Sequence, residues 1–190
     1  MITPHKCLKK LEWLIGHWKS EKAVIKGCGN KTFSYLSEFK CETVGQPNLI
    51  FHINGFNVQP LDASDTDTST TLQWPNELKP FHREMGFLRV NPQDENDMRL
   101  SYLNSQNVGI TCTEEGEIDS SKKKFTLETK TIERSCFAKE PRVVKLKREY
   151  LLNENDNNVL NVTVHMKTSK MNDNDEPYEH LVIKYRKTSD

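Results

Sequence analysis

Hydrophobic and polar residues alternate along many short segments of the chain. Between residues 32 and 43, Phe33, Tyr35, Phe39 and Cys41 share one parity, and mainly polar residues occupy the other. Every second side chain of a strand points to the same face, so this pattern predicts a strand with one buried and one wet face. Similar segments raise the number of expected strands to about ten, at 18–26, 32–43, 49–58, 81–90, 97–104, 107–114, 123–133, 144–152, 160–167 and 179–187.

Turn-forming residues separate these segments. Asn91-Pro92, Glu115-Gly116 and the run 153–158 are such turn signals, and no long amphipathic helix competes with the strands. Consecutive antiparallel strands can close into an up-and-down barrel, which leaves no exposed sheet edges. A barrel of about ten strands is wide enough for one small ligand. The sequence therefore predicts an all-β fold, an antiparallel up-and-down β-barrel.

The length of 190 residues suits one domain, 1–190, with its core over about 11–187. An apolar cluster at 8–15 precedes the strands and predicts a short helix or turn that plugs one end of the barrel. Residues 59–80 are rich in Asp, Ser and Thr and are expected to form a mobile loop. Within that loop, Trp74 is interpreted as an anchor on the barrel rather than as a lid residue.

Charge and composition exclude several partners. Lys plus Arg and Asp plus Glu both total 27, so no net positive field exists to hold a nucleic acid. Apolar runs are too short to cross a membrane, and the N-terminus MITPHKCLKK lacks the apolar core of a signal peptide. We expect a cytoplasmic location, with the nucleus as a second compartment. The five cysteines are widely spaced, without a C-x-x-C pair, and are expected to be reduced thiols.

Common catalytic signatures such as G-x-S-x-G, the Walker loop and H-E-x-x-H are absent from the sequence. His180 begins the apolar strand HLVIKY directly after a loop that contains a proline, which places it near a barrel mouth. A single histidine there could be an axial iron ligand, although an ordinary strand histidine is the commoner use. Segment 81–89 is interpreted as a salt-bridged strand in which Gly86 marks a bulge or a close backbone approach.

Taken together, several motifs resemble the nitrobindin family, which includes the C-terminal domain of a THAP-type zinc-finger protein. The resemblance runs from about 11 to 187 and keeps the order and spacing of the motifs. The matching pieces are LEWLIGHW at 11–18, KPFHREMGFLR at 79–89, SQNVG at 105–109, EEGE at 114–117, FAKEP at 137–141 and HL at 180–181.

The resemblance implies a ten-stranded barrel, similar in outline to fatty-acid-binding proteins, that holds haem b at one end. In that family a histidine at the position of His180 binds the ferric iron, and the other face of the haem is open to nitric oxide. The resemblance further implies isomerisation of peroxynitrite to nitrate, which would make the chain a haem-dependent peroxynitrite isomerase. One neutral imidazole leaves the sixth iron position free, and ferric iron is a Lewis acid.

The resemblance also implies a set of cofactor contacts. By position these are Phe81, His82, Gln106, Trp18 and Gly29. Gly29 is included because it falls near the position at which the family has a threonine that contacts haem. The family motif G-x-W-x-G-x-G reads GHWKSEK at 16–22, so that Ser20 and Lys22 replace two glycines. A close backbone approach at these two positions is not carried over.

Two other functions are compatible with an apolar barrel. The first is a non-enzymatic carrier of a fatty acid or another apolar ligand. Arg89 or Arg148 could then bind a carboxylate, although a surface salt bridge is the favoured use of either residue. The second is an interaction module that has lost haem, which the replaced glycines near Trp18 keep open.

Overall fold

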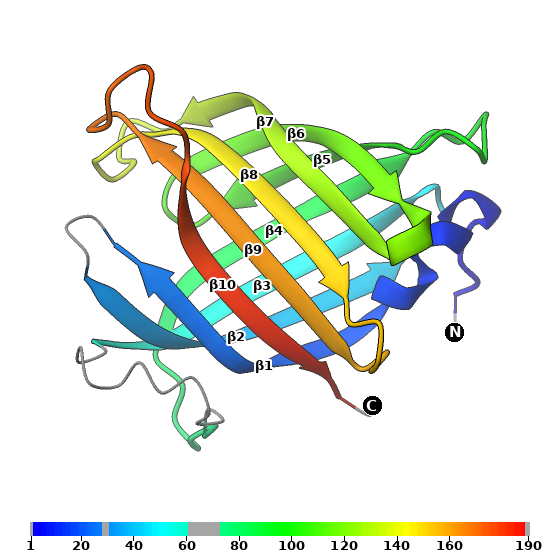
Figure 1. Ribbon diagram of the computed structural model, residues 1–190, viewed down its shortest axis with the longest axis horizontal. Coiled ribbons are helices and arrows are strands. Elements are labelled where there is room, and N and C mark those ends of the chain that lie inside the picture. The colour runs from blue at the N-terminus through cyan, green and yellow to red at the C-terminus, as the bar shows by residue number, and fades with distance from the viewer. Residues whose placement is uncertain (1, 28–30, 61–72, 189–190) are drawn as a thin grey trace.

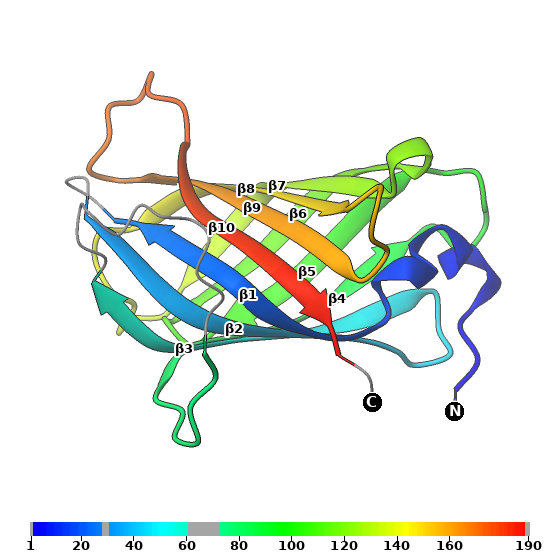
Figure 2. The ribbon, with the colours of Figure 1, turned by 60° about the horizontal axis from the view of Figure 1, so that its bottom comes forward.

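The computed structural model describes residues 2–27, 31–60 and 73–188 (Figure 1). Within these residues the chain forms a closed antiparallel barrel of ten strands, in which each strand pairs with the next and β1 also pairs with β10. Figure 2 shows β1 and β10 side by side where the barrel closes. The strands are β1 Gly16–Lys26, β2 Thr32–Thr43, β3 Asn48–Pro60, β4 Pro80–Val90, β5 Arg99–Gln106, β6 Ile110–Asp119, β7 Lys124–Arg134, β8 Val143–Leu152, β9 Val159–Thr168 and β10 Tyr178–Lys187.

The all-β up-and-down barrel predicted from the alternation is confirmed, with two changes of boundary. The expected turn at Glu115-Gly116 is wrong, because both residues lie inside β6. A Cβ on Gly116 would lie 1.7 Å from the carbonyl oxygen of Thr126, so this glycine permits a close approach of β7 and does not mark a turn. The ends of the loop expected at 59–80 belong to β3 and β4, and its centre, 61–72, lies outside the described residues.

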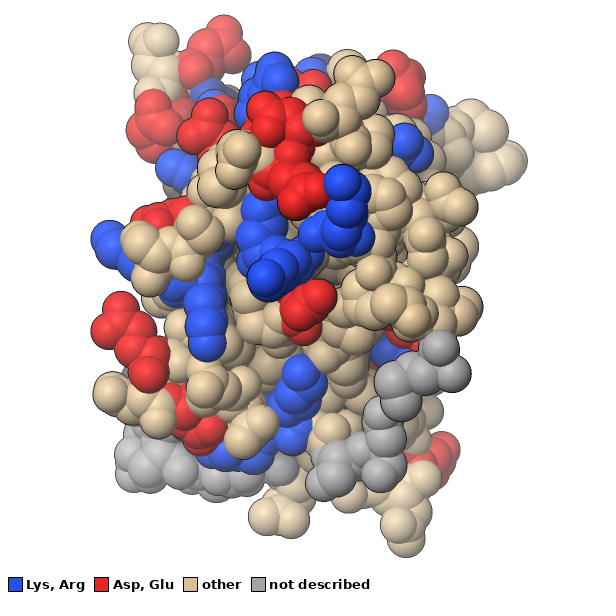
Figure 3. Space-filling view, turned by 90° about the vertical axis from the view of Figure 1, so that its right-hand side faces the viewer, with Lys and Arg blue, Asp and Glu red and all other residues tan. Residues whose placement is uncertain are grey.

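The predicted N-terminal plug is a 3₁₀ helix, η1 (Lys6–Leu14), which lies across the end of the barrel where β1 begins. Leu8, Leu11 and Leu14 are fully buried against the barrel interior. The second, single-turn helix is η2 (Ser120–Lys122). In the described part of the chain, no helix has the length and apolar character to cross a membrane. Seen from the plugged end, basic and acidic side chains are interspersed, in line with the net charge of zero (Figure 3).

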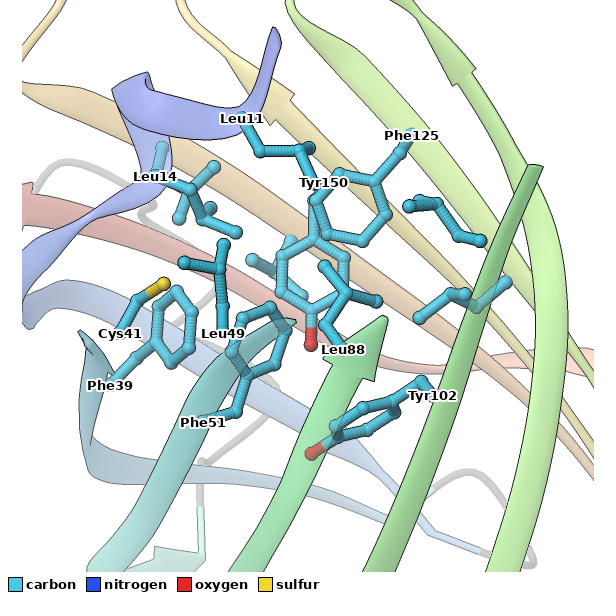
Figure 4. Close-up of a cluster of buried hydrophobic side chains, with 14 of the residues drawn as sticks. Leu11, Leu14, Phe39, Cys41, Leu49, Phe51, Leu88, Tyr102, Phe125 and Tyr150 are labelled. Carbon is cyan, nitrogen blue, oxygen red and sulfur yellow. The ribbon is translucent and has the colours of Figure 1, made fainter. Parts of the chain in front are cut away.

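Aromatic rings fill the barrel beneath η1 (Figure 4). Phe125 stacks on Tyr150 with ring centroids 4.5 Å apart, and Phe39 meets Phe51 edge to face at 4.9 Å. All four side chains are at most 2 % exposed. This packed half of the barrel stabilises the fold and leaves the opposite end for a cavity.

Ser20, which stands where the family motif has a glycine, has a structural role of its own. The register of β1 against β2 breaks between Lys19 and Val24, so the backbone ladder is interrupted there. The Ser20 hydroxyl accepts a hydrogen bond from the backbone N–H of Ser37 at 2.8 Å, in place of a strand carbonyl. The Ser37 hydroxyl in turn lies 2.7 Å from the Tyr185 hydroxyl. Ser20 therefore supplies a hydrogen bond at the point where β1 and β2 separate.

Replacing Ser20 by alanine should lower the free energy of unfolding by about 1–3 kcal/mol, because it leaves the buried N–H of Ser37 without its partner. Urea denaturation followed by tryptophan fluorescence measures this change. The control is Ser34→Ala on the half-buried part of β2, for which we expect a change within about 0.5 kcal/mol. Equal effects of the two substitutions would contradict the role assigned to Ser20.

Trp74 contacts the barrel as the sequence predicted for an anchor. Its Nε1–H donates to the Ser20 carbonyl at 3.3 Å, and Lys19 Nζ lies 4.8 Å from the ring centroid. The ring also meets Phe56 edge to face at 6.2 Å. These contacts hold the described end of the long connection between β3 and β4 against the outside of the barrel.

Candidate ligand cavity

A cavity of about 290 Å³ lies at the end of the barrel opposite η1. The wall residues lie at the end of the barrel where the odd-numbered strands, β1 to β9, end and the even-numbered strands, β2 to β10, begin. Phe81 lies at the cavity rim and is 51 % exposed. Most of the wall is apolar, with contributions from Ile25, Ile53, Val108, Ile110, Val143 and Met166. A mainly apolar pocket with a few polar groups is typical of a small-molecule site.

His180 reaches this cavity through a local irregularity of β10. In the pairing with β9, Glu179 lies opposite His165 and Leu181 lies opposite Val164, so His180 has no residue opposite it. Such a bulge places two consecutive residues on one face and redirects a side chain. Both His180 and Leu181 accordingly line the cavity.

The imidazole of His180 is held in one orientation, and its surroundings favour the neutral form. Its Nδ1 lies 2.9 Å from the carbonyl oxygen of Lys26, which can only accept, so Nδ1 carries the hydrogen. Burial lowers the pKa of His180, and nearby His82 acts in the same direction, while the bond to Lys26 opposes both. The neutral form therefore dominates at pH 7, with an unprotonated Nε2 that can bind a metal.

The structure brings together four of the six site residues predicted from the sequence. Phe81, His82 and Gln106 line the same cavity as His180. Of these four residues, His82 on β4 and Gln106 on the neighbouring strand β5 add polar side chains to the wall. The fifth prediction, Gly29, lies outside the described residues.

The sixth predicted residue, Trp18, lies away from this cavity, and its role as a cofactor contact stays a prediction. Trp18 is fully buried and belongs to the core near η1, and it is not among the described residues that line the cavity. Its Nε1–H donates to the carbonyl oxygen of Leu14 at 2.9 Å, and Lys187 Nζ lies 4.9 Å from its ring. The motif tryptophan thus fastens the plug, because β1 enters the barrel at the plugged end.

A buried ion-pair cluster crosses the barrel at the inner side of the cavity. Arg148 of β8 binds Glu84 of β4 through Nη1 and Nη2, at 2.9 and 3.0 Å, and its Nε lies 2.9 Å from Glu114 Oε2 of β6. All three residues are at most 5 % exposed. The surface salt bridge favoured for Arg148 from the sequence is therefore wrong, whereas Arg89 does lie exposed on the outside of β4. We call Glu84, Arg148 and Glu114 the interior triad.

The two carboxyl groups of the interior triad differ in their proton affinity. Burial acts to raise the pKa of Glu84, but Arg148 and His82 outweigh it and hold this pKa at about 2. Burial and the charge of Glu84 raise the pKa of Glu114, which Arg148 offsets only in part. The Tyr102 hydroxyl additionally donates a hydrogen bond to Glu84 Oε1 at 2.8 Å. Glu84 therefore holds a proton less tightly than Glu114 does.

Polar contacts connect the interior triad to the cavity wall on both sides. His82 Nε2 lies 3.8 Å from Glu84 Oε2. Asn104 donates to Glu114 Oε1 at 3.0 Å, and Gln106 Nε2 lies 3.3 Å from the side-chain oxygen of Asn104. The sequence carried one signal of this buried cluster. Arg148 lies two residues from Leu146 and two from Tyr150, so it occupies a position of β8 that faces the barrel interior.

The cavity residues fit a haem group. His180 offers one neutral imidazole nitrogen, and the apolar wall suits a porphyrin ring. Lys139 also lines the cavity and supplies positive charge for the carboxylates that a haem carries, whereas Arg134, which lines it too, is paired with Glu140 at 2.7 Å. The donor set therefore matches a cofactor that requires a single protein ligand.

Comparison with known proteins identifies the family. A family model described as "THAP4-like, heme-binding beta-barrel domain" matches residues 7–187. The chain belongs to this family, that of the nitrobindins. The family expected from the sequence motifs is thereby confirmed.

Several relatives carry the name "Peroxynitrite isomerase THAP4". The protein of Bos taurus is 33 % identical over 187 residues, which are 96 % of this chain and 26 % of that protein. The protein of Homo sapiens is 32 % identical, with 96 % and 27 % covered. The chain thus spans about a quarter of the length of these relatives. The crystal structure of Rv2717c from M. tuberculosis has the same fold, with a TM-score of 0.72, 22 % identity and full coverage of both chains.

Proposed function

We propose that the chain binds haem b with His180 as the axial iron ligand, binds nitric oxide, and converts peroxynitrite to nitrate. The observation that carries this proposal is the neutral, oriented imidazole of His180 on the wall of an apolar cavity. The description of the family and the name of the relatives support it from outside the structure.

Three polar residues of the cavity have a defined task in this proposal. His180 binds from one side only, and the hydrogen bond to Lys26 keeps its ring from rotating. Gln106 and His82 bring N–H groups to the wall, where they can orient the oxygen atoms of a small anion. Ferric haem would supply Lewis acidity toward the peroxo anion. The conversion rearranges atoms within one anion, so it consumes no reductant.

Titration of the purified chain with ferric haem tests the ligand assignment. We expect a shifted Soret band that saturates at one haem per chain, and a loss of haem affinity of at least about tenfold in His180→Ala. The control is His52→Ala, because His52 of β3 is not among the described cavity residues. A Soret band of His180→Ala that matches the wild type would refute the role of His180.

The reaction is tested separately by stopped-flow measurement of peroxynitrite decay together with the nitrate yield. The haem-loaded wild type should accelerate the decay in proportion to its concentration and raise the nitrate yield. The haem-free chain should do neither. Acceleration without a higher nitrate yield would contradict isomerisation while leaving haem binding intact.

A carrier of fatty acids is the second candidate, because the wall is mainly apolar. Such a carrier needs a cation for the ligand carboxylate inside the barrel. Arg148, the arginine of the interior triad, is already bound by two carboxylates of the protein. The structure therefore favours haem over an acyl carboxylate that binds inside the barrel.

A further inference from the structure

The interior triad has an asymmetric position relative to the cavity. Glu84 and Arg148 both line it, whereas Glu114 is not among the described residues of the wall. On β4, Glu84 follows the rim residues Phe81 and His82, so it lies deeper in the barrel than they do. A ligand that enters from the rim would thus meet Glu84 where it binds Arg148.

Glu84 binds the guanidinium in the manner of a carboxylate ligand. Its two oxygens accept from Nη1 and Nη2 of Arg148 at 2.9 and 3.0 Å, the two-point geometry by which arginine binds free carboxylates. The Nε atom of Arg148 is turned toward Glu114, at 2.9 Å from Oε2. The two Nη atoms, bound by Glu84, are the donors that a ligand in the cavity would need.

The neighbourhood holds Glu84 in this position. Tyr102 donates a hydrogen bond to Glu84 Oε1 at 2.8 Å. The Tyr102 ring passes close to Gly86, where an added Cβ would lie 2.7 Å from Tyr102 Cε2. The close backbone approach predicted for Gly86 thus makes room for the ring that fixes Glu84.

We propose that Glu84 is a specificity-determining residue: its carboxylate occupies the anion site of Arg148 and so excludes apolar ligands with an acidic head group from the inner cavity. This inference concerns the protein cavity alone and does not require haem. An incoming carboxylate would have to displace Glu84 into an apolar interior, where an unpaired carboxylate is strongly disfavoured. A neutral apolar ligand faces no such obstacle.

Binding of matched ligands to the haem-free chain tests the proposal. The probes are decanoate and decan-1-ol, which share one chain length and differ in the head group, measured by isothermal titration calorimetry at pH 7.5. In Glu84→Gln, the affinity for decanoate should rise at least about tenfold, because a neutral amide accepts from Arg148 at one atom only and competes poorly with a charged carboxylate for the guanidinium. The affinity for decan-1-ol should change by less than about threefold.

Two further variants separate this effect from a general loosening of the cavity. Glu114→Gln removes the same charge from the triad but leaves Glu84 on Arg148, so decanoate affinity should stay within about threefold of the wild type. Adding Arg148→Met to Glu84→Gln should abolish the gain. A gain that persists without Arg148, or that decan-1-ol shares, would overturn the proposal.

Glu84→Gln removes a buried charge and could reduce stability, so thermal unfolding is measured with each probe present. A ligand that binds the folded state raises its melting temperature. Decanoate should raise the melting temperature of Glu84→Gln more than decan-1-ol does, and a poorly folded variant should refold only with decanoate. If neither probe has this selective effect, the proposal is wrong. Because haem titration is a separate measurement, this outcome would leave the role of His180 unaffected.

Discussion

Arg148→Met should lower the free energy of unfolding at pH 7.5 by about 3–5 kcal/mol. The substitution leaves the carboxylates of Glu84 and Glu114 buried without the cation that pairs with both. Removal of one partner from a buried ion pair is costly because the remaining charge can no longer be solvated. Urea denaturation measures the loss. Arg89→Met on the exposed face of β4 is the matched control and should change stability by less than about 0.5 kcal/mol.

The loss caused by Arg148→Met should shrink as the pH falls. In the wild type the pKa of Glu84 is about 2, below its ordinary value of 4.5, so its stabilising contribution is complete above pH 4.5 and is lost toward pH 2. Without Arg148, burial raises the pKa of Glu84, and the folded variant gains stability when it takes up a proton. Removal of Arg148 also takes away the charge that partly offsets the raised pKa of Glu114, so both carboxyl groups contribute to the change.

Denaturation at pH 5 and pH 7.5 therefore distinguishes a charge effect from a packing effect. We expect the deficit of Arg148→Met to be smaller at pH 5 by at least about 1 kcal/mol. A deficit that is equal at the two pH values would mean that lost packing of the arginine side chain, and not the unpaired carboxylates, causes the destabilisation.

Trp18→Ala should destabilise the fold by about 3–5 kcal/mol, the range for loss of a large buried aromatic side chain. Trp18 is fully buried, donates a hydrogen bond to Leu14 at the end of η1, and packs beneath Lys187. Its removal opens a space between the plug and the barrel and leaves a carbonyl without its donor. Urea denaturation followed by circular dichroism measures the loss.

Trp18→Phe separates the structural role of this residue from a role at the cofactor. The phenyl ring fills part of the space but cannot donate to Leu14, so a smaller loss of stability is expected. Because Trp18 is not among the described cavity residues, the haem titration of this variant should match the wild type within about threefold. A larger change in haem affinity would restore Trp18 to the cofactor site.

Much of the fold is readable from local alternation. The inward residues of β2 and β8 recur at every second position, because a strand turns successive side chains to opposite faces. The inward position of Arg148 was readable in the same way, since it shares the parity of Leu146 and Tyr150. The general rarity of buried arginine argued for the surface instead, and that rule fails where two carboxylates satisfy the guanidinium.

The motifs of the chain identified the family, and with it the residues that gather at one end of the barrel. Phe81, His82, Gln106 and His180 do line one cavity, because antiparallel pairing brings the start of β4 and β10 to the same end as the finish of β5. Trp18 belongs to the same family motifs, but β1 begins at the other end. A motif records that residues recur together and does not state which end of the barrel they occupy.

Alternation and motifs, which are properties of the chain alone, were thus sufficient for the strands, their closure and the family. Tertiary structure alone decided the protonation form of His180 and the partners of Arg148. The first depends on the bulge of β10 and on the carbonyl of Lys26, 154 residues away in the chain. The second depends on carboxylates that lie 64 and 34 residues away. Such contacts arise only when the barrel closes, because hydrogen bonds and charges act over a few ångströms in space.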